Sequence, residues 1–253
     1  VVILEKNING NPTSVINRLV KRLGEPVIRK AMHQAMAVMG KHFVLGRNIE
    51  EAFKNAKKNI DDGYTYSFDM LGEAALTQID ANKYLQDYLN AIAFIGQHNA
   101  KQLASNHSNN TPPTSTDYKL LPSISVKLSA LHPRYEVAKK QRVMTELYQT
   151  MLTIIQKARS LNVGITIDAE EMDRLELSLE LFEKLYQSDA VKGWGNLGLV
   201  VQAYSKRALP VLVWLTALAK QQGDLIPLRL VKGAYWDTEI KLAQQAGLAE
   251  YPV

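Results

Sequence analysis

Charged and amide side chains recur at the ends of short apolar segments in this sequence. They are Asp69, Glu73, Lys127, Asp168, Glu170, Glu171, Gln202, Arg229 and Lys232. Burying a charged side chain costs much free energy unless an opposite charge or a ligand meets it. One such residue at a segment end is ordinary, but recurrence along the chain predicts a shared polar site.

These side chains suit three kinds of chemistry. Asp168 and Glu170 are two residues apart, so in a strand they lie on the same side, where two carboxylates can hold a divalent metal. Lys127 or Lys232 could form a Schiff base with a carbonyl substrate. Arg229 could instead stabilise an anion or an electron-rich ring. The residue types therefore leave open a metal- or lysine-dependent lyase.

Other chemical motifs carry little weight. The segment GWGNLG at 193–198 has the glycine spacing of a dinucleotide-binding loop, but it precedes an apolar strand instead of following one, which favours a turn. The five histidines include no pair at metal-ligand spacing, and no serine-hydrolase, zinc-protease or Walker lysine motif is present. Because the chain has no cysteine, a disulfide scaffold, a thiolate zinc site and a catalytic thiol are excluded.

Short β-rich segments alternate with longer amphipathic ones from Gly63 onwards. The expected strands are YTYSFDML (64–71), SISVKLS (123–129), VGITIDAE (163–170), LGLVVQAY (197–204) and IPLRLVKGAYW (226–236). Such an alternation predicts a parallel sheet, either a closed (β/α)₈ barrel or an open doubly wound sheet. Parallel barrels gather their chemistry at the carboxyl ends of the strands, so the polar side chains would meet at one mouth.

Helices are expected between these strands. The clearest candidates are residues 140–160, 175–186 and 209–219, the last of them as a buried helix. Asp173 and Glu176 resemble a capping box at the start of the second of these helices. The polar stretch 105–123 is expected to be a surface loop.

The first part of the chain predicts helices without strands. One helix would carry an apolar face formed by Ile28, Met32, Met36, Met39 and Phe43. A second would follow Asn48 as its N-cap. The change of pattern near Gly63 predicts an N-terminal helical segment, residues 1–62, and a barrel segment, residues 63–253.

Composition sets the remaining bounds. The chain has 253 residues and a formal net charge of +5, and its scattered basic residues are typical of a solvated surface and give only weak support for nucleic-acid binding. The longest apolar run, LPVLVWLTALA at 209–219, is too short to span a membrane. Because the chain opens with valine and without a signal-peptide pattern, we expect a piece of a longer protein.

The strand-end segments together resemble a known enzyme family. The segments DMLGEAALT, SISVKLSALHPRY, GITIDAEEMDRLELSL, VVQAYSKR and RLVKGAYWDTEIK are similar, in order, to successive motifs of the proline dehydrogenases. The resemblance is strongest to the proline dehydrogenase domain of the bacterial bifunctional flavoenzymes called proline utilization A, and it runs from about Gly24 to the end. It implies a distorted, TIM-like (β/α)₈ barrel, of which this chain would supply about five βα units after its N-terminal helices.

The resemblance implies an enzyme and a reaction. An FAD-dependent oxidoreductase would convert L-proline to Δ1-pyrroline-5-carboxylate by hydride transfer to the flavin, the first step of proline catabolism to glutamate. The electrons would pass to a quinone. The resemblance also implies a cytoplasmic protein with peripheral membrane association, a homo-oligomeric parent, and DNA binding, if any, by a segment outside this chain.

The resemblance assigns roles to individual residues. Asp168, Arg229 and Lys127 would be catalytic, with Arg229 beside the reactive edge of the flavin ring. Lys127 would help to hold the substrate carboxylate, and Glu73 would gate the pocket by pairing with an arginine; Asp69 is expected beside them from its place at the end of the first strand. The expected FAD-binding residues are Asp168, Ala169, Gln202, Arg229, Val231, Lys232, Gly233, Ala234 and Trp236. No metal site is implied.

The family's pattern continues beyond the part that this chain matches. Three further βα units, a Thr–His pair that contacts the flavin, and a last helix with two substrate-binding arginines have no counterpart before Val253. We therefore expect an incomplete barrel with two open sheet edges. A non-catalytic fragment is the alternative to an active enzyme.

Overall fold

A computed structural model of the chain describes residues 24–106 and 121–253. The chain divides into two compact units, Val1–Asp62 and Gly63–Val253. The surface loop expected at 105–123 lies mostly outside the described residues.

The first helix of the N-terminal unit is α3 (Glu25–Phe43). It starts after Gly24 with a proline in its first turn, where the missing amide proton costs no helical hydrogen bond. Its expected apolar face is not buried, since Met36 is 55% and Phe43 is 86% exposed. The helix is therefore confirmed, whereas burial of its apolar face within this unit is not observed.

The second helix of this unit is α4 (Ile49–Asp61). The side chain of Asn48 accepts a hydrogen bond of 2.9 Å from the Glu51 amide, which satisfies one of the free N–H groups at the helix start. The predicted Asn48 cap is confirmed. Phe53 and Ala56 form the buried side of α4.

A five-stranded parallel sheet forms the centre of the second unit. Its strands follow one another in the order β1-β2-β3-β4-β5, and all four neighbouring pairs are parallel. The strands are β1 (Ser67–Asp69), β2 (Ser123–Val126), β3 (Ile165–Ile167), β4 (Leu197–Gln202) and β5 (Leu228–Val231). Each lies inside a segment expected to be a strand. A doubly wound sheet would reverse its strand order at a switch point, and this sheet does not.

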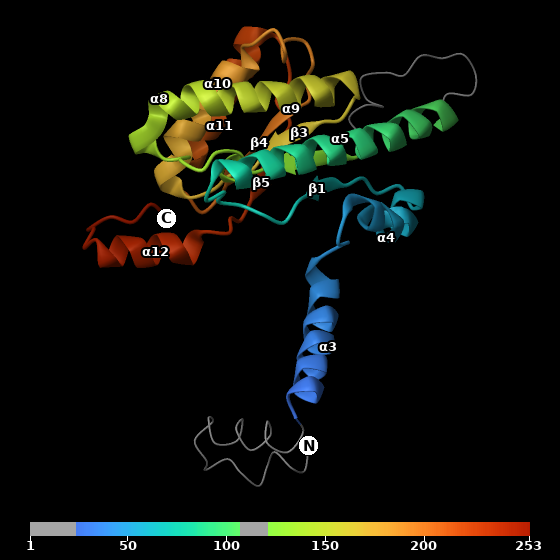
Figure 1. The fold of residues 1–253 in the computed structure, drawn as a ribbon. Helices are drawn as coiled ribbons and strands as arrows, with labels where there is room; N and C mark the ends of the chain where they lie inside the picture. The colour runs from blue at the N-terminus through green and yellow to red at the C-terminus, as the bar shows by residue number, and fades with distance from the viewer. Residues whose placement is uncertain (1–23, 107–120) are drawn as a thin grey trace. The chain divides into compact units, whose positions relative to one another are not determined.

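The sheet is curled like part of a barrel wall (Figure 1). Arg229 on β5 donates a hydrogen bond of 3.3 Å to Ser67 on β1, although three strands separate them in the sheet. A flat sheet would hold these edge strands far apart, because neighbouring strands are about 4.8 Å apart. The expected fold, an incomplete TIM-like barrel of about five βα units preceded by helices, is confirmed.

Strand residues alternate between two environments. The outward-facing positions are apolar, and those of the first four strands are buried: Phe68, Ile124, Val126, Ile165, Ile167, Leu197, Leu199 and Val201. Polar residues such as Ser67, Asp69 and Arg229 occupy the inner face, as the two-residue period of a strand requires. The polar site therefore belongs to the concave side.

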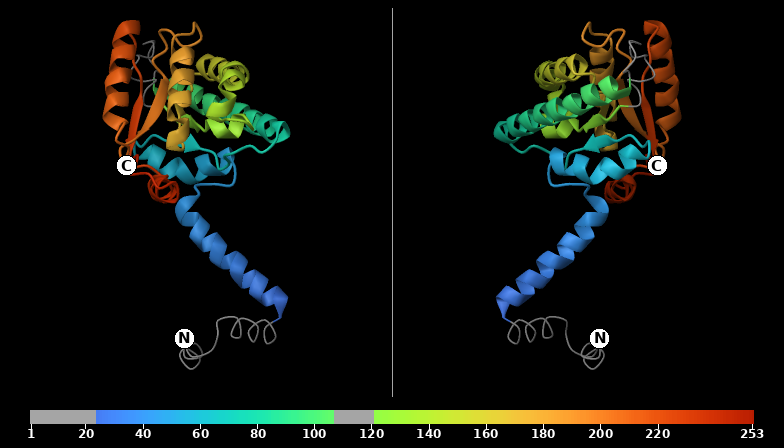
Figure 2. Two further views of the ribbon diagram at one scale, coloured as in Figure 1. Left: turned by 90° about the vertical axis from the view of Figure 1, so that its left-hand side faces the viewer. Right: turned by 90° about the vertical axis from the view of Figure 1, so that its right-hand side faces the viewer.

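Helices cover the outer side of the sheet (Figures 1 and 2). α5 packs on β2 and on α9, α9 contacts α10, and α11 packs on β4. The elements after β1 are α5 (Gln78–Asn106), α7 (Leu128–Leu131), η1 (Val137–Lys139), α8 (Lys140–Arg142), η2 (Val143–Leu147), α9 (Tyr148–Ser160), η3 (Met172–Arg174), α10 (Leu175–Tyr186), α11 (Ala208–Gln222) and α12 (Trp236–Gln245). The helices expected at 140–160 and 175–186 are confirmed, the former with a π-helical turn at η2.

The expected capping box of α10 is wrong. Asp173 lies within η3 and does not cap α10, and Arg174 before the helix provides no side-chain cap. The Met172 amide at the start of η3 instead donates to Oε1 of Glu239 on α12, at 2.8 Å. The start of η3 is thus held by a long-range contact, and α10 begins without a side-chain cap.

The helix expected at 209–219 forms as α11 but is buried on one face only. Leu209 and Val213 are 69% and 63% exposed, whereas Val211, Leu215 and Leu218 are buried. A helix that packs on a sheet on one side and faces solvent on the other buries one apolar stripe. This explains why α11 is only partly buried. Within the described ranges, no helix has both the length and the apolar character needed to cross a bilayer.

Candidate active site

Four charged side chains meet on the concave side of the sheet. Asp168 pairs with two cations, since its Oδ2 lies 3.3 Å from Nζ of Lys127 and its Oδ1 accepts a hydrogen bond from Nη2 of Arg229. Nζ of Lys127 also donates to Oδ1 of Asp69, at 2.6 Å. Asp168 is deeply placed, with 11% of its side chain exposed. We call Asp69, Lys127, Asp168 and Arg229 the charge cluster.

Strand register explains why the cluster forms. Val126 of β2 and Ile167 of β3 are partners in the parallel ladder. One residue further along each strand, Lys127 and Asp168 turn to the inner face together. Arg229 comes from β5, and the curl of the sheet brings it across to the same place.

The cluster holds Lys127 in its charged form. Burial lowers the pKa of this lysine, but its hydrogen bond to Asp69 and the charge of Asp168 outweigh burial, so its pKa is raised. Burial raises the pKa of the Asp168 carboxyl, and the charges of Lys127 and Arg229 oppose that shift. A nucleophilic lysine must lose its proton, so this environment disfavours Schiff-base chemistry at Lys127.

Glu170 does not join Asp168, which corrects the expectation of a carboxylate pair. β3 ends at Ile167, so the two-residue alternation of a strand does not extend to Glu170. Its carboxylate accepts a 3.0 Å hydrogen bond from the Ser129 amide and lies 3.5 Å from Arg174. Across residues 24–106 and 121–253, no group of three or more His, Asp or Glu side chains is placed to hold a metal ion.

Gln202 joins the loops that follow β3, β4 and β5. Its Nε2 donates to the Glu170 carbonyl oxygen at 2.8 Å, and its Oε1 accepts from the Ala234 amide at 3.2 Å. Gly233 has a φ of 110°, and a Cβ there would lie 2.4 Å from the Tyr204 ring and 2.8 Å from Oε1 of Gln202. Only glycine fits this close approach.

The other expected residues lie around this centre. Ala169 follows Asp168 directly, and Val231 is half-buried at the end of β5 in register with Gln202. Lys232 and Trp236 are exposed, and the side chain of neither forms a hydrogen bond or ion pair with another described residue. Glu73 is exposed in the loop after β1. The structure therefore brings together the inner-face residues and leaves these last three at the rim.

Several residues of the site were not singled out in the sequence. Tyr88 of α5 is 1% exposed, and its hydroxyl accepts a 3.2 Å hydrogen bond from the Lys127 amide. Burial raises its pKa above the ordinary tyrosine range. Ser67 holds Arg229, and Glu239 holds the start of η3. Ser67 is predictable, because its two-residue spacing puts it on the same side of the strand as Asp69. Tyr88 and Glu239 lie in helices, where no local sequence pattern indicates their contacts with the site.

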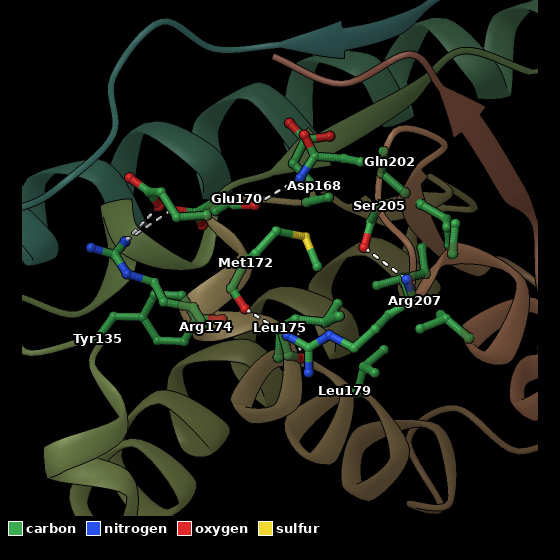
Figure 3. Close-up of a pocket in the computed structure, with 18 residues that line it drawn as sticks. Tyr135, Asp168, Glu170, Met172, Arg174, Leu175, Leu179, Gln202, Ser205 and Arg207 are labelled. Atoms are coloured by element: carbon green, nitrogen blue, oxygen red, sulfur yellow. Dashed lines mark hydrogen bonds and ion pairs between the residues drawn. The ribbon is translucent and has the colours of Figure 1, made fainter. Parts of the chain in front are cut away.

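A narrow cavity lies beneath these loops, between the sheet and helices α10 and α11 (Figure 3). Asp168 and Gln202 lie at its upper edge in this view and Met172 at its centre, with Arg174 and Arg207 on either side. Its volume of about 30 Å³ can admit water but no ring system. It lies outside the concave face, so we place the candidate site at the charge cluster.

Comparison with protein families identifies this arrangement. The profile described as "Proline dehydrogenase" matches residues 52–253, which include the whole sheet and the charge cluster. This chain belongs to the proline dehydrogenase family. The expected resemblance is thereby confirmed.

Curated relatives of the proline dehydrogenase family fall into two kinds. "Bifunctional protein PutA" of Klebsiella aerogenes is 48% identical over 246 residues, which are 96% of this chain and 18% of that protein. "Proline dehydrogenase 1" of Bacillus subtilis strain 168 is 31% identical over 196 residues, 77% of this chain and 52% of that protein. The chain thus spans a small part of the bifunctional relatives.

Solved structures of proline dehydrogenase relatives share the fold. The D778Y mutant of proline utilization A from Bradyrhizobium japonicum is 47% identical, with a TM-score of 0.71 over 94% of this chain and 23% of that one. The Bdellovibrio bacteriovorus enzyme, inactivated by N-propargylglycine, is 26% identical, with a TM-score of 0.77 over 94% of this chain and 25% of that one.

One expectation about the N-terminal segment is wrong. The profile described as "DNA-binding domain of Proline dehydrogenase" matches residues 1–43, which include α3. The family resemblance read from the sequence implies that any DNA-binding segment lies outside this chain. The basic residues of this segment are scattered and form no distinctive local motif, so the match could not be predicted from the sequence alone.

Proposed function

We propose that the protein carrying this chain is an FAD-dependent proline dehydrogenase that oxidises L-proline to Δ1-pyrroline-5-carboxylate. Family membership supports the reaction class. The observation that carries the proposal is the charge cluster, because it puts Lys127, Asp168 and Arg229 on one concave face. These are the three residues to which the family resemblance assigns catalytic roles.

The inner face suits a flavin. FAD, when bound, supplies the acceptor for a hydride. Arg229 is anchored through Nη1 and Nη2 by Ser67 and Asp168, while its buried Nε has no hydrogen-bond partner among the described residues. A fixed cation with a free donor favours an electron-rich reduced ring. The Tyr204 hydroxyl is a second buried polar group without a partner in the described part of the chain.

The turn after β5 supports the same assignment. The backbone at Gly233 and Ala234 is held close to Gln202 and Tyr204, so its position is fixed before any ligand arrives. Backbone amides in such a turn suit the polar edge or the phosphates of a cofactor. In this proposal Gln202, Val231, Ala169 and the rim residues Lys232 and Trp236 complete the cofactor contacts.

Lys127 suits the carboxylate of the substrate. Its ammonium has three donors, two of which are directed at Asp69 and Asp168. The third can meet a carboxylate, and charge-assisted hydrogen bonds of this kind are stronger than neutral ones. Asp168 orients both cations, and Glu73 closes the site from the rim. The electron acceptor that we propose is a quinone.

The rival functions have less support. A lysine-dependent lyase would need a deprotonated lysine, whereas Asp69 and Asp168 raise the pKa of Lys127. A lyase that uses Asp168 and Glu170 to hold one metal would need their carboxylates together, whereas they have separate partners. The cytoplasmic location, peripheral membrane association and oligomerisation of the complete protein are further proposals that rest on family membership.

An absorption spectrum tests the proposal directly. The purified protein should retain flavin bands through gel filtration, and L-proline should bleach them in the absence of oxygen. A colourless protein that forms large assemblies would favour a non-catalytic fragment. A colourless protein that magnesium activates would favour the lyase.

A further inference from the structure

We propose that Ser129 is a positioning residue that holds the loop after β1, residues 70–77, and with it Glu73, at the mouth of the site. The inference rests on the proposed function for its kinetic test. We call residues 70–77 the β1–α5 loop. Ser129 lies in α7, directly after β2, and is 3% exposed.

Ser129 accepts hydrogen bonds from two consecutive amides of this loop. The Ala74 amide donates to the Ser129 hydroxyl oxygen at 3.0 Å, and the Ala75 amide donates to the Ser129 carbonyl oxygen at 2.9 Å. Neither amide belongs to a helix or strand, so these bonds replace the ladder that regular structure would provide. A single residue therefore fixes the backbone next to Glu73.

The β1–α5 loop cannot hold this shape by its own preferences. Ala74 has a φ of 53°, in the left-handed region where its Cβ crowds the following carbonyl oxygen. Gly72 has a φ of 135°, and a Cβ there would lie 2.4 Å from the Tyr84 ring. Strained backbone of this kind persists only where neighbouring groups over-determine it. Ser129 provides that restraint at Ala74.

Ser129 is itself connected to the remaining loops. Its amide donates to Oε1 of Glu170 at 3.0 Å, and only 5% of the Glu170 side chain is exposed. The carbonyl oxygen of Glu170 accepts from Gln202, whose own oxygen accepts from Ala234. Hydrogen bonds thus run from the β1–α5 loop through Ser129 to the loops after β3, β4 and β5. In this proposal Glu170 has a structural role, whereas the sequence pattern leaves a metal-binding role open.

The charge of Glu73 influences the ionisation of Tyr235. Burial raises the pKa of Tyr235, which follows β5, and among the charged groups that add to this shift Glu73 is the strongest. The exposed Glu73 carboxylate is thus within electrostatic range of Tyr235. Moving its loop would change what a substrate meets on entry without moving the charge cluster.

The substitution Ser129→Ala tests the proposal, with Ser188→Ala as a matched control. Ser188 also bonds the backbone through its hydroxyl, although as a donor to the Leu185 carbonyl oxygen, and it lies at the far end of α10. In the complete protein, Ser129→Ala should raise KM for L-proline about tenfold, from loss of one buried hydrogen bond, while flavin content and kcat stay near the wild-type values. Ser188→Ala should change neither parameter.

A double mutant separates positioning from simple packing. Glycine adopts φ near 53° without strain, so Ala74→Gly in the Ser129→Ala background should lower the raised KM back toward the wild-type value. Ser129→Thr keeps the hydroxyl and should stay closer to the wild type than Ser129→Ala. A positioning role would be contradicted if Ala74→Gly did not lower the KM of Ser129→Ala and if Ser129→Thr had as high a KM as Ser129→Ala.

Hydrogen exchange tests the same contact without any enzymatic assay. In the wild-type protein the Ala74 and Ala75 amides should exchange more slowly than those of an unstructured chain, and Ser129→Ala should speed exchange across residues 72–76. Unprotected amides in the wild type would overturn the proposal even if the variant did not fold. Protected amides in a protein whose flavin is not reduced by L-proline would instead contradict the proposed function. The contact between Ser129 and the β1–α5 loop would then still be supported.

Discussion

Arg229 of β5 and Ser67 of β1 are joined by a hydrogen bond of 3.3 Å across the concave side of the sheet, although 162 residues separate them in the chain. The same guanidinium binds Asp168 after β3. One side chain thus spans the space that the strands enclose. Its position depends on the curl of the sheet and, in turn, helps to hold the inner face together.

Substitution of Arg229 tests the site most directly. Arg229→Met keeps much of the side-chain length but removes the charge and every donor, so flavin reduction by L-proline should slow by about 100-fold or flavin should be lost. Stopped-flow absorbance measures the first outcome and the flavin-to-protein ratio the second. Arg47→Met is a suitable control because Arg47 is 90% exposed and, among the described residues, forms its one ion pair with Glu51. Normal flavin reduction in Arg229→Met would remove the assigned role.

The raised pKa of Lys127 predicts that the stability of the protein changes with pH in the alkaline range. Its folded-state pKa is raised above the ordinary 10.5, so its contribution to stability is fully present below that value and is lost as pH rises through the folded pKa. The difference in free energy of unfolding between the wild type and Lys127→Met should therefore shrink in strongly alkaline buffer. Urea titrations at a series of pH values measure it. A difference that grows with pH would contradict the pairing.

Glu146 predicts a dependence on acidic pH. Its hydrogen bonds with Arg142 are the main cause that lowers its pKa from 4.5 to about 2. A depressed carboxyl pKa contributes stability that is present above the unfolded value and is lost as pH falls toward about 2. The wild type should lose stability across this interval more steeply than Glu146→Gln. Equal slopes in thermal melts would show that the pair does not contribute.

Gly233 and Gly193 make a matched pair of glycines. Both have positive φ, but a Cβ at Gly233 meets Tyr204 and Gln202, whereas a Cβ at Gly193 meets nothing within 4 Å. Gly233→Ala should lower the free energy of unfolding by about 3 kcal/mol and reduce flavin content, and Gly193→Ala should cost about 1 kcal/mol. Calorimetry and absorbance report the two effects. Equal losses would mean that the close approach at Gly233 has no consequence.

Much of the inner face could be predicted from the sequence because it depends on short-range order. The two-residue period of a strand and the parallel order of the sheet are enough to bring Lys127 beside Asp168. The same rule failed at Glu170, because β3 ends at Ile167 and the chain turns before reaching it. Pairing with neighbouring strands decides where a strand ends. The local sequence pattern carries no information about that pairing.

Contacts made by helices were harder to predict. Asp173 has the right spacing for a capping box but lies within η3, whose first amide, that of Met172, binds Glu239 of α12. Tyr88 binds the Lys127 amide from the middle of α5. In both cases the partner lies dozens of residues away, and only the packing of helices against the sheet decides which side chain arrives.

The charge cluster has one more consequence, for the salt dependence of binding. Its two cations and two carboxylates sum to no net formal charge. An amino acid zwitterion also brings one charge of each sign, so long-range attraction contributes little to its capture and screening removes little. Affinity for such a ligand should stay nearly constant as ionic strength rises, because short, oriented contacts and not the overall field select it.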